Sequence, residues 1–165
     1  MTKTLLAVLS LFVSSSSIAQ KSQSVFFELG GNGGFVSVNY DSRFTNSEKG
    51  LGYRAGFGFI PPSNSFGVSD PAIWTVPVGL NYLLGKTRHY FEAGLGATFY
   101  FYNGTGTDFL GTTEIKKGAG ILLFPSAGYR YSPYGKAFQG RLFISPVISS
   151  EGVSFYWGLS IGIKF

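Results

Sequence analysis

Residues 153–165 read VSFYWGLSIGIKF, and this stretch repeats an apolar side chain at every second position. The apolar positions are Val153, Phe155, Trp157, Leu159, Ile161, Ile163 and Phe165. Successive side chains of a β-strand point to opposite faces of a sheet, so the stretch predicts a strand with one wholly apolar face. A slip of one residue would exchange the two faces, which makes a change of register costly.

The same alternation recurs in seven segments upstream, separated by clusters of Gly, Asn, Pro and Ser. No window shows the three- and four-residue apolar spacing of a capped amphipathic helix. The sequence therefore predicts an all-β chain of eight antiparallel strands. With the last segment included, the expected strands cover residues 24–31, 35–44, 51–60, 73–84, 90–102, 119–131, 138–147 and 153–165.

Composition indicates which face of these strands points inward. Only 13% of the 165 residues are charged, against about 25% in soluble domains, while 18% are aromatic and 24 are glycine. This argues against a disordered chain, a coiled coil and collagen. Alternation alone would also fit a soluble lipocalin-like barrel. However, a polar face made mostly of Gly and Ser suits the narrow lumen of an eight-stranded barrel better than it suits a solvated surface.

The apolar face is then expected to meet lipid, so the sequence predicts a transmembrane β-barrel. Aromatic residues near the strand ends are expected to form the girdles typical of the two membrane interfaces. The predicted girdle residues are Tyr40, Trp74, Tyr82 and Trp157.

Connection lengths predict an up-and-down meander with both termini in the periplasm. Outer-membrane barrels have long outer loops and short periplasmic turns. The two longest connections, residues 61–72 and 103–118, are the third and the fifth, whereas the second, fourth and sixth are short. Eight strands of about 11 residues also fit a single barrel domain over residues 20–165.

Residues 1–19, MTKTLLAVLSLFVSSSSIA, have the three parts of a secretory signal peptide. Lys3 is positive, residues 5–13 are apolar, and Ser17-Ile18-Ala19 forms a cleavage site before Gln20. The apolar run is shorter than the ~20 residues that a membrane-spanning helix needs. We therefore expect export, with cleavage after residue 19.

Two local features bear on the strand ladder. Pro77, Pro125 and Pro146 lie inside expected strands and cannot donate a ladder hydrogen bond, so each predicts a bulge, a local break or a shorter strand. Asn32-Gly33, flanked by glycines, predicts a tight hairpin turn between the first two strands.

The leader, the stretch ELGGNGG at residues 28–34 and the terminal alternating strand together resemble small OmpA-like outer-membrane β-barrel proteins of Gram-negative bacteria, without a periplasmic domain. Residues 28–34 are similar to members from Bacteroidetes-type organisms. The resemblance implies an outer-membrane location, contact with lipid and lipopolysaccharide, and insertion by the barrel-assembly machinery. The C-terminal pattern resembles the signal that this machinery recognises; its residues are Trp157, Leu159, Ile161, Ile163 and Phe165. Barrels of this kind include structural proteins, adhesins and lipid-modifying enzymes.

Few residues suggest enzymatic or cofactor chemistry. The chain has no Cys and one histidine, His89, which falls in an expected periplasmic turn without the nearby Ser of lipid A-modifying barrels. We therefore expect no enzymatic activity, no cofactor and no metal site. The longest basic run is Lys116-Lys117, which argues against nucleic-acid binding. This pair could contact lipopolysaccharide phosphates or could simply be solvated.

One group of charged residues falls on the expected inward face: Glu28, Arg54, Glu92, Arg130 and Arg141. An Arg facing lipid at the midplane would cost ~2–4 kcal/mol, whereas paired charges inside a lumen satisfy one another. We predict an ion network that plugs the barrel; the alternative is separate hydration in a water-filled lumen. The leading function is a structural or surface-interaction role through residues 61–72 and 103–118. A narrow channel or carrier for small or apolar solutes is the alternative, and a lipid A-modifying enzyme is the third possibility.

Overall fold

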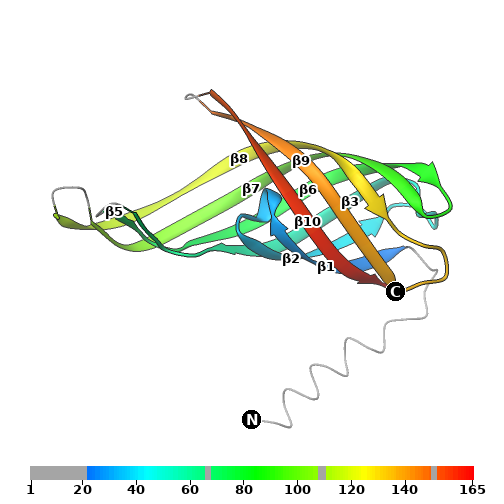
Figure 1. The fold of residues 1–165 in the computed structure, drawn as a ribbon, viewed down its shortest axis with the longest axis horizontal. Coiled ribbons are helices and arrows are strands. Elements are labelled where there is room, and N and C mark those ends of the chain that lie inside the picture. The colour runs from blue at the N-terminus through cyan, green and yellow to red at the C-terminus, as the bar shows by residue number, and fades with distance from the viewer. Residues whose placement is uncertain (1–21, 66–67, 108–110, 150–151) are drawn as a thin grey trace, which may run out of the picture.

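The computed structural model describes residues 22–65, 68–107, 111–149 and 152–165, and the expected signal peptide lies outside them. Eight strands build a closed antiparallel barrel (Figure 1). They are β1 (Gln23–Gly30), β2 (Val36–Arg43), β3 (Gly50–Ile60), β6 (Ile73–Lys86), β7 (His89–Thr107), β8 (Thr113–Tyr131), β9 (Phe138–Ser149) and β10 (Gly152–Lys164). Within the described ranges, no helix has the length and apolar character needed to cross a membrane.

Each barrel strand pairs with the next one along the chain, and β10 pairs with β1 to close the ring. This confirms the predicted eight-stranded up-and-down meander. The Phe165 amide donates to the Gln23 carbonyl (3.0 Å), so the first and last strands meet at one end of the barrel. We call this the terminus end and the opposite one the loop end.

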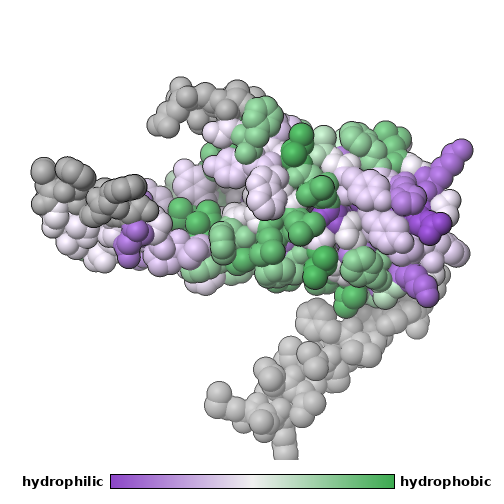
Figure 2. Space-filling view, viewed as in Figure 1, coloured by the Kyte–Doolittle hydropathy of each residue, from purple (hydrophilic) through white to green (hydrophobic). Residues whose placement is uncertain are grey.

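The alternation of the sequence becomes the two faces of the wall. Polar side chains such as Asn39, Ser145 and Ser160 are buried in the lumen, whereas Phe27, Ile161 and similar residues are exposed outside. Figure 2 shows the exposed apolar side chains gathered over the middle of the visible face, with the most hydrophilic residues at the terminus end. Among the described residues, six apolar or aromatic side chains depart from the rule and are buried: Phe26, Leu83, Tyr90, Phe124, Phe143 and Val147.

The long connections contain more β-structure than the sequence predicts. β7 and β8 continue pairing from Tyr102↔Gly118 to Thr107↔Thr113, so most of the expected loop 103–118 is a strand extension. Its run of alternating Thr and Gly keeps the two-residue period without the apolar face that marked the other strands. The third connection contains a hairpin of β4 (Ser63–Ser65) and β5 (Val68–Asp70).

The prolines break the ladder on one side only. Pro77 pairs with Thr98 on β7, but the β3–β6 ladder lacks the two pairs between Ala55↔Val78 and Gly58↔Thr75. Pro125 and Pro146 likewise keep their pairing to β7 and β10 and lose it toward each other. The register of β3 and β6 is the same on both sides of Pro77, so this proline gives a break without a bulge, whereas the β8–β9 ladder ends before Pro125 and Pro146.

The predicted tight hairpin at Asn32-Gly33 is wrong. The chain instead makes a short 3-10 turn, η1 (Gly31–Gly33), which is buried. Gly30, Gly31 and Gly34 adopt φ angles of 68°, 71° and 98°, which glycine adopts readily. These glycines allow the connection between β1 and β2 to fold into the barrel.

Candidate functional site in the barrel lumen

Seven charged side chains from six strands meet inside the terminus half of the barrel. Each has at most 5% of its surface exposed. The carboxylates are Glu28, Asp41 and Glu92, and the guanidinium groups are Arg43, Arg54, Arg130 and Arg141. We call this group the lumen ion cluster. All five residues of the predicted network lie in it.

Glu92 on β7 joins the two arginines of the neighbouring strands. Its carboxylate accepts from Arg130 Nε at 2.8 Å and from Arg141 Nη2 and Nε at 2.6 and 3.1 Å. Arg130 and Arg141 are directly paired across β8 and β9. Two like charges side by side repel each other, so Glu92 between them is what makes this pairing tolerable.

Asp41 on β2 connects the opposite wall to the same arginine. Arg130 donates from Nη1 and Nη2 to both carboxylate oxygens of Asp41, at 3.2 and 3.1 Å. Arg43 donates to Asp41 at 2.6 Å, and the Asn81 amide binds both Asp41 and Arg43. Arg130 therefore bridges the lumen from β8 to β2, with charge-assisted bonds at both ends.

Glu28 on β1 makes the looser part of the cluster. Its Oε2 lies 3.5 Å from Arg54 Nη1 and 4.0 Å from Arg141 Nη1. The Arg141 guanidinium also lies over the Phe26 ring, 4.5 Å from its centroid. Inward-facing aromatic rings thus contribute cation–π contacts where carboxylates are few.

Asp41, Arg43 and Asn81 belong to the site but were not among the five residues predicted from the sequence. The signal was present, since Asp41 and Arg43 share the inward parity of β2 and Asn81 that of β6. With all seven members counted, four guanidinium groups and three carboxylates leave a net charge of +1.

The η1 turn lies across the lumen on the loop-end side of the ion cluster. Thr75 Oγ1 donates to the Gly33 carbonyl at 2.6 Å, and Thr98 Oγ1 donates to the Asn32 carbonyl at 2.7 Å. The Gly31 backbone lies against Phe143 and the Glu28 carboxylate. Strands on the far wall of the barrel therefore hold this turn in the lumen.

Glu48 crosses the terminus end of the lumen. It belongs to the turn between β2 and β3 and accepts from Lys164 Nζ at 2.6 Å, Tyr90 OH at 3.1 Å and Ser132 Oγ at 3.4 Å. These partners come from β10, β7 and the turn after β8. Glu48 was not predicted as a site residue, because no local pattern in the sequence indicates that this turn points inward.

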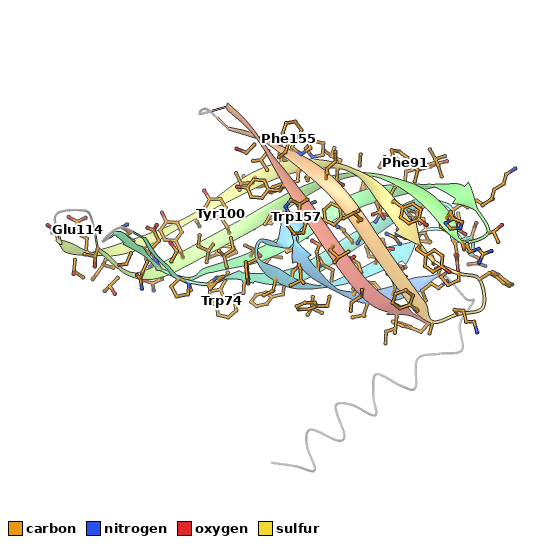
Figure 3. All side chains as sticks on the ribbon, viewed as in Figure 1. Trp74, Phe91, Tyr100, Glu114, Phe155 and Trp157 are labelled. Atoms are coloured by element: carbon orange, nitrogen blue, oxygen red, sulfur yellow. The ribbon has the colours of Figure 1, made fainter. Side chains whose placement is uncertain are left out.

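The predicted girdle and assembly-signal residues lie on the outer surface. Trp74, Tyr82 and Trp157 are exposed and Tyr40 is half-buried, and Figure 3 shows Trp157 on β10 and Trp74 near the loop end. The C-terminal apolar residues Leu159, Ile161, Ile163 and Phe165 are all exposed. Their roles as a girdle and as an assembly signal remain predictions.

His89 lies outside the lumen, at the terminus end. Its Nδ1 is 2.5 Å from the Tyr129 hydroxyl, and its ring packs against Tyr129 and Tyr131. Lys116 lies on the β7–β8 extension and pairs with Asp70 at 2.9 Å. Among the described residues, no group of three or more His, Cys, Asp and Glu side chains could hold a metal ion.

Solved structures with the same architecture place this barrel in a known class. The N-terminal β-barrel domain of Pseudomonas aeruginosa OprF matches with a TM-score of 0.60 at 10% identity, covering 88% of this chain and 96% of that one. Ail, the attachment invasion locus protein of Yersinia pestis, matches with a TM-score of 0.53 at 15% identity, covering 88% and 97%. These likenesses show the fold of an eight-stranded outer-membrane β-barrel.

Sequence comparison adds nothing to this assignment, since no protein-family model and no curated protein matches the chain. These two structural neighbours come from Pseudomonas and Yersinia. They give no support to the Bacteroidetes-type origin suggested by residues 28–34.

Proposed function

We propose that this chain is a non-enzymatic outer-membrane protein, exported by a cleaved signal peptide over residues 1–19, whose lumen is closed to solutes. The terminus end faces the periplasm and the loop end faces the exterior. Its role is structural or depends on interactions at the cell surface. The observation that carries the proposal is the lumen ion cluster, because its charges are used in mutual pairing instead of lining a water-filled path.

Three layers of contacts support a closed lumen. The η1 turn lies across the barrel above the ion cluster, held by Thr75 and Thr98. The cluster joins opposite walls through Arg130. Glu48 ties β7 and β10 together below it. Buried charges are stable when they are paired and hydrogen-bonded, and Asp41, Glu92 and Arg130 make such bonds in the cluster.

Liposome swelling tests the closed lumen against the alternative of a narrow channel. Vesicles containing the protein are expected to swell in sugar or amino-acid solutions no faster than protein-free vesicles. A known porin in the same lipid provides the positive control. Swelling that depends on the protein and on solute size would favour the channel.

The loop-end extension is the surface that would serve an external role. The β4–β5 hairpin pairs with β7 at Ser69↔Thr107, and Lys116 binds Asp70, so two long connections form one projecting unit. Ail, the attachment invasion locus protein of Yersinia pestis, shares the fold. Replacing residues 63–70 by a short Gly-Ser turn should leave the barrel folded and reduce adhesion of cells that display it; unchanged adhesion would place the role elsewhere.

A lipid A-modifying activity has the least support. His89 contacts Tyr129 on the outer surface at the periplasmic end, far from outer-leaflet lipid A. Lipid A from cells that overproduce the protein should have an unchanged mass spectrum. New acylated or deacylated species would overturn the non-enzymatic proposal.

A further inference from the structure

The barrel wall is open between β8 and β9 in its loop-end half. The β8–β9 ladder runs from Tyr131↔Gly140 to Ala127↔Ile144 and has no further pair among the described residues. β8 continues along β7 toward Thr113, and β9 continues along β10 to Ser149↔Gly152. Figure 1 shows the β9–β10 ribbon leaving the wall above this point.

Two prolines explain why the ladder ends there. Continuing its register by two residues would place Pro125 opposite Pro146. The Pro125 carbonyl faces β9, because it accepts from Ser145 Oγ at 2.7 Å. A strand residue directs its N–H and C=O to the same side, so these two residues would form a hydrogen-bonded pair in which both donors are missing. Each of the two strands thus contributes a proline that stops the β8–β9 ladder at this point.

The ribbon is free on its other side as well. Pairing between β1 and β10 ends at Gly30↔Gly158, because β1 turns inward into η1. Beyond this point Trp157 and Phe155 pair only with β9. In the described part of the upper β9–β10 ribbon, both edges therefore lack a strand neighbour.

The gap leads to an apolar cavity of about 280 Å³ inside the loop-end half of the barrel. Leu122 and Phe124 of β8 line one side of the gap, and Val147 and Tyr156 of the ribbon line the other. The η1 turn forms the floor through Gly31 and Asn32. Leu122 and Phe124 take inward positions that most strands fill with Gly, Ser or Thr, which makes this part of the lumen apolar.

The outer surface beside the gap is apolar too. Ile121 and Leu123 of β8 and Ile144 of β9 are exposed at this level, as is Phe155 on the ribbon (Figure 3). In an outer-membrane barrel such a surface meets hydrocarbon. The gap therefore connects an apolar cavity with the lipid phase, and the floor formed by η1 separates that cavity from the ion cluster.

We propose that the gap between β8 and β9 is a lateral entrance through which one acyl chain of a membrane lipid enters the cavity. The volume lies just below the ~300–1,000 Å³ range of small-molecule sites, which suits part of a single chain. At the point where the ladder ends, Pro125 and Pro146 have no N–H to leave unpaired, and Ser145 Oγ donates to the Pro125 carbonyl.

Contact quenching of tryptophan by brominated acyl chains tests the entrance. In a background with Trp74→Phe and Trp157→Phe, Phe124→Trp places the sole tryptophan in the cavity. Tyr82→Trp reports on the outer surface, and Tyr90→Trp reports on the closed, terminus half of the lumen. In vesicles of brominated phosphatidylcholine, Phe124→Trp should lose emission to the extent of Tyr82→Trp, while Tyr90→Trp should retain its emission.

A variant in which β8 and β9 can pair across the gap tests whether the quenching depends on the gap. Pro125→Thr with Pro146→Thr restores both donors, so β8 and β9 can continue their ladder. In this variant the emission of Phe124→Trp should rise to the level of Tyr90→Trp. Unchanged quenching would show that chains reach the cavity by another route and would overturn the lateral entrance. If, with Pro125 and Pro146 in place, Phe124→Trp retained as much emission as Tyr90→Trp, the cavity would contain no acyl chain and the proposal would be overturned.

A second arm distinguishes lipid from a solute that arrives through water. Unbrominated vesicles receive brominated decanoic acid from the aqueous phase; quenching in this arm alone would mean entry from the loop end and would contradict the proposal. Folding of each variant is checked by its heat-dependent mobility on gels. Tyr100→Trp, which also lines the cavity, replaces Phe124→Trp if that variant does not fold.

Discussion

The position of each charged side chain follows from the inward or outward parity of its strand. Glu28, Glu92 and Arg130 fall on positions that point into the lumen, where each finds a partner of opposite charge. On the outer face the same residues would meet hydrocarbon without a partner. Parity therefore predicted five of the seven charged members of the lumen ion cluster from the sequence.

Glu92→Gln should destabilise the barrel strongly, because it removes the carboxylate between Arg130 and Arg141. Loss of one partner of a buried ion pair costs about 3–5 kcal/mol. We expect a loss of this size in the free energy of unfolding, measured by urea titration in lipid vesicles.

The exposed Glu114→Gln, at the tip of the β7–β8 extension (Figure 3), is the matched control and should change the free energy of unfolding little. If both variants unfold at the same urea concentration as the wild type, the cluster does not depend on the pairing of Glu92.

The inward or outward position of a residue on its strand does not identify which of the inward-facing charged side chains contact one another. Asp41 and Arg43 face the lumen like the predicted members, but their contact with Arg130 depends on distances across the barrel. The inward position of Glu48 could not be predicted at all, because a turn has no alternation from which the direction of a side chain could be inferred. The charged residues of the site could thus be predicted as a set, and its connectivity could not.

Among the elements, η1 decides whether the lumen is open or filled. Gly30 to Gly34 is rich in glycine, which fits a tight hairpin and an inward turn equally well at the level of sequence. What selects the inward turn are the hydroxyl donors of Thr75 and Thr98 on the far wall. These are long-range contacts, which a local pattern does not contain.

Thr75→Val combined with Thr98→Val should loosen η1. Each leaves a buried carbonyl without its donor, at about 1–3 kcal/mol per group. We expect faster hydrogen exchange at the amides of residues 31–34 and a lower free energy of unfolding. Thr105→Val, on the exposed β7–β8 extension, is the control, and exchange at η1 that matches the control would mean that other contacts hold the turn.

The outer face of the strands makes a separate prediction. Leu80 lies midway along β6 and is exposed, so Leu80→Arg should place a charge near the membrane midplane. The expected cost is ~2–4 kcal/mol in the free energy of folding into vesicles. Ile115→Arg, on the extension beyond the membrane, should cost far less. Equal costs at the two sites would contradict the membrane position assigned to β6.

The strands themselves were predictable to within a few residues, except where the apolar face stopped. β7 and β8 extend past Tyr102 and Gly118, because alternating Thr and Gly still pair once β-structure has begun. The prolines predicted breaks in the ladder, but the sequence did not show that Pro125 and Pro146 would lie opposite each other on adjacent strands. Their opposition follows from register, which only the folded barrel defines.

At the scale of the whole molecule, the barrel has two different interiors. The terminus half is filled by the ion cluster and covered by Glu48, and the loop-end half holds an apolar cavity that opens toward lipid. The η1 turn separates them. Composition could predict a membrane barrel with a polar lumen, but this division depends on inward apolar residues such as Leu122, Phe124 and Val147, which interrupt the average pattern.

Planar-bilayer recording measures the central claim, a closed lumen, most directly. Wild-type protein inserted into a bilayer should give no steady conductance above the baseline at moderate voltage. Insertion is verified by recovering folded, heat-modifiable protein from the same membrane. A steady, large conductance from verified wild-type protein would contradict the closed lumen.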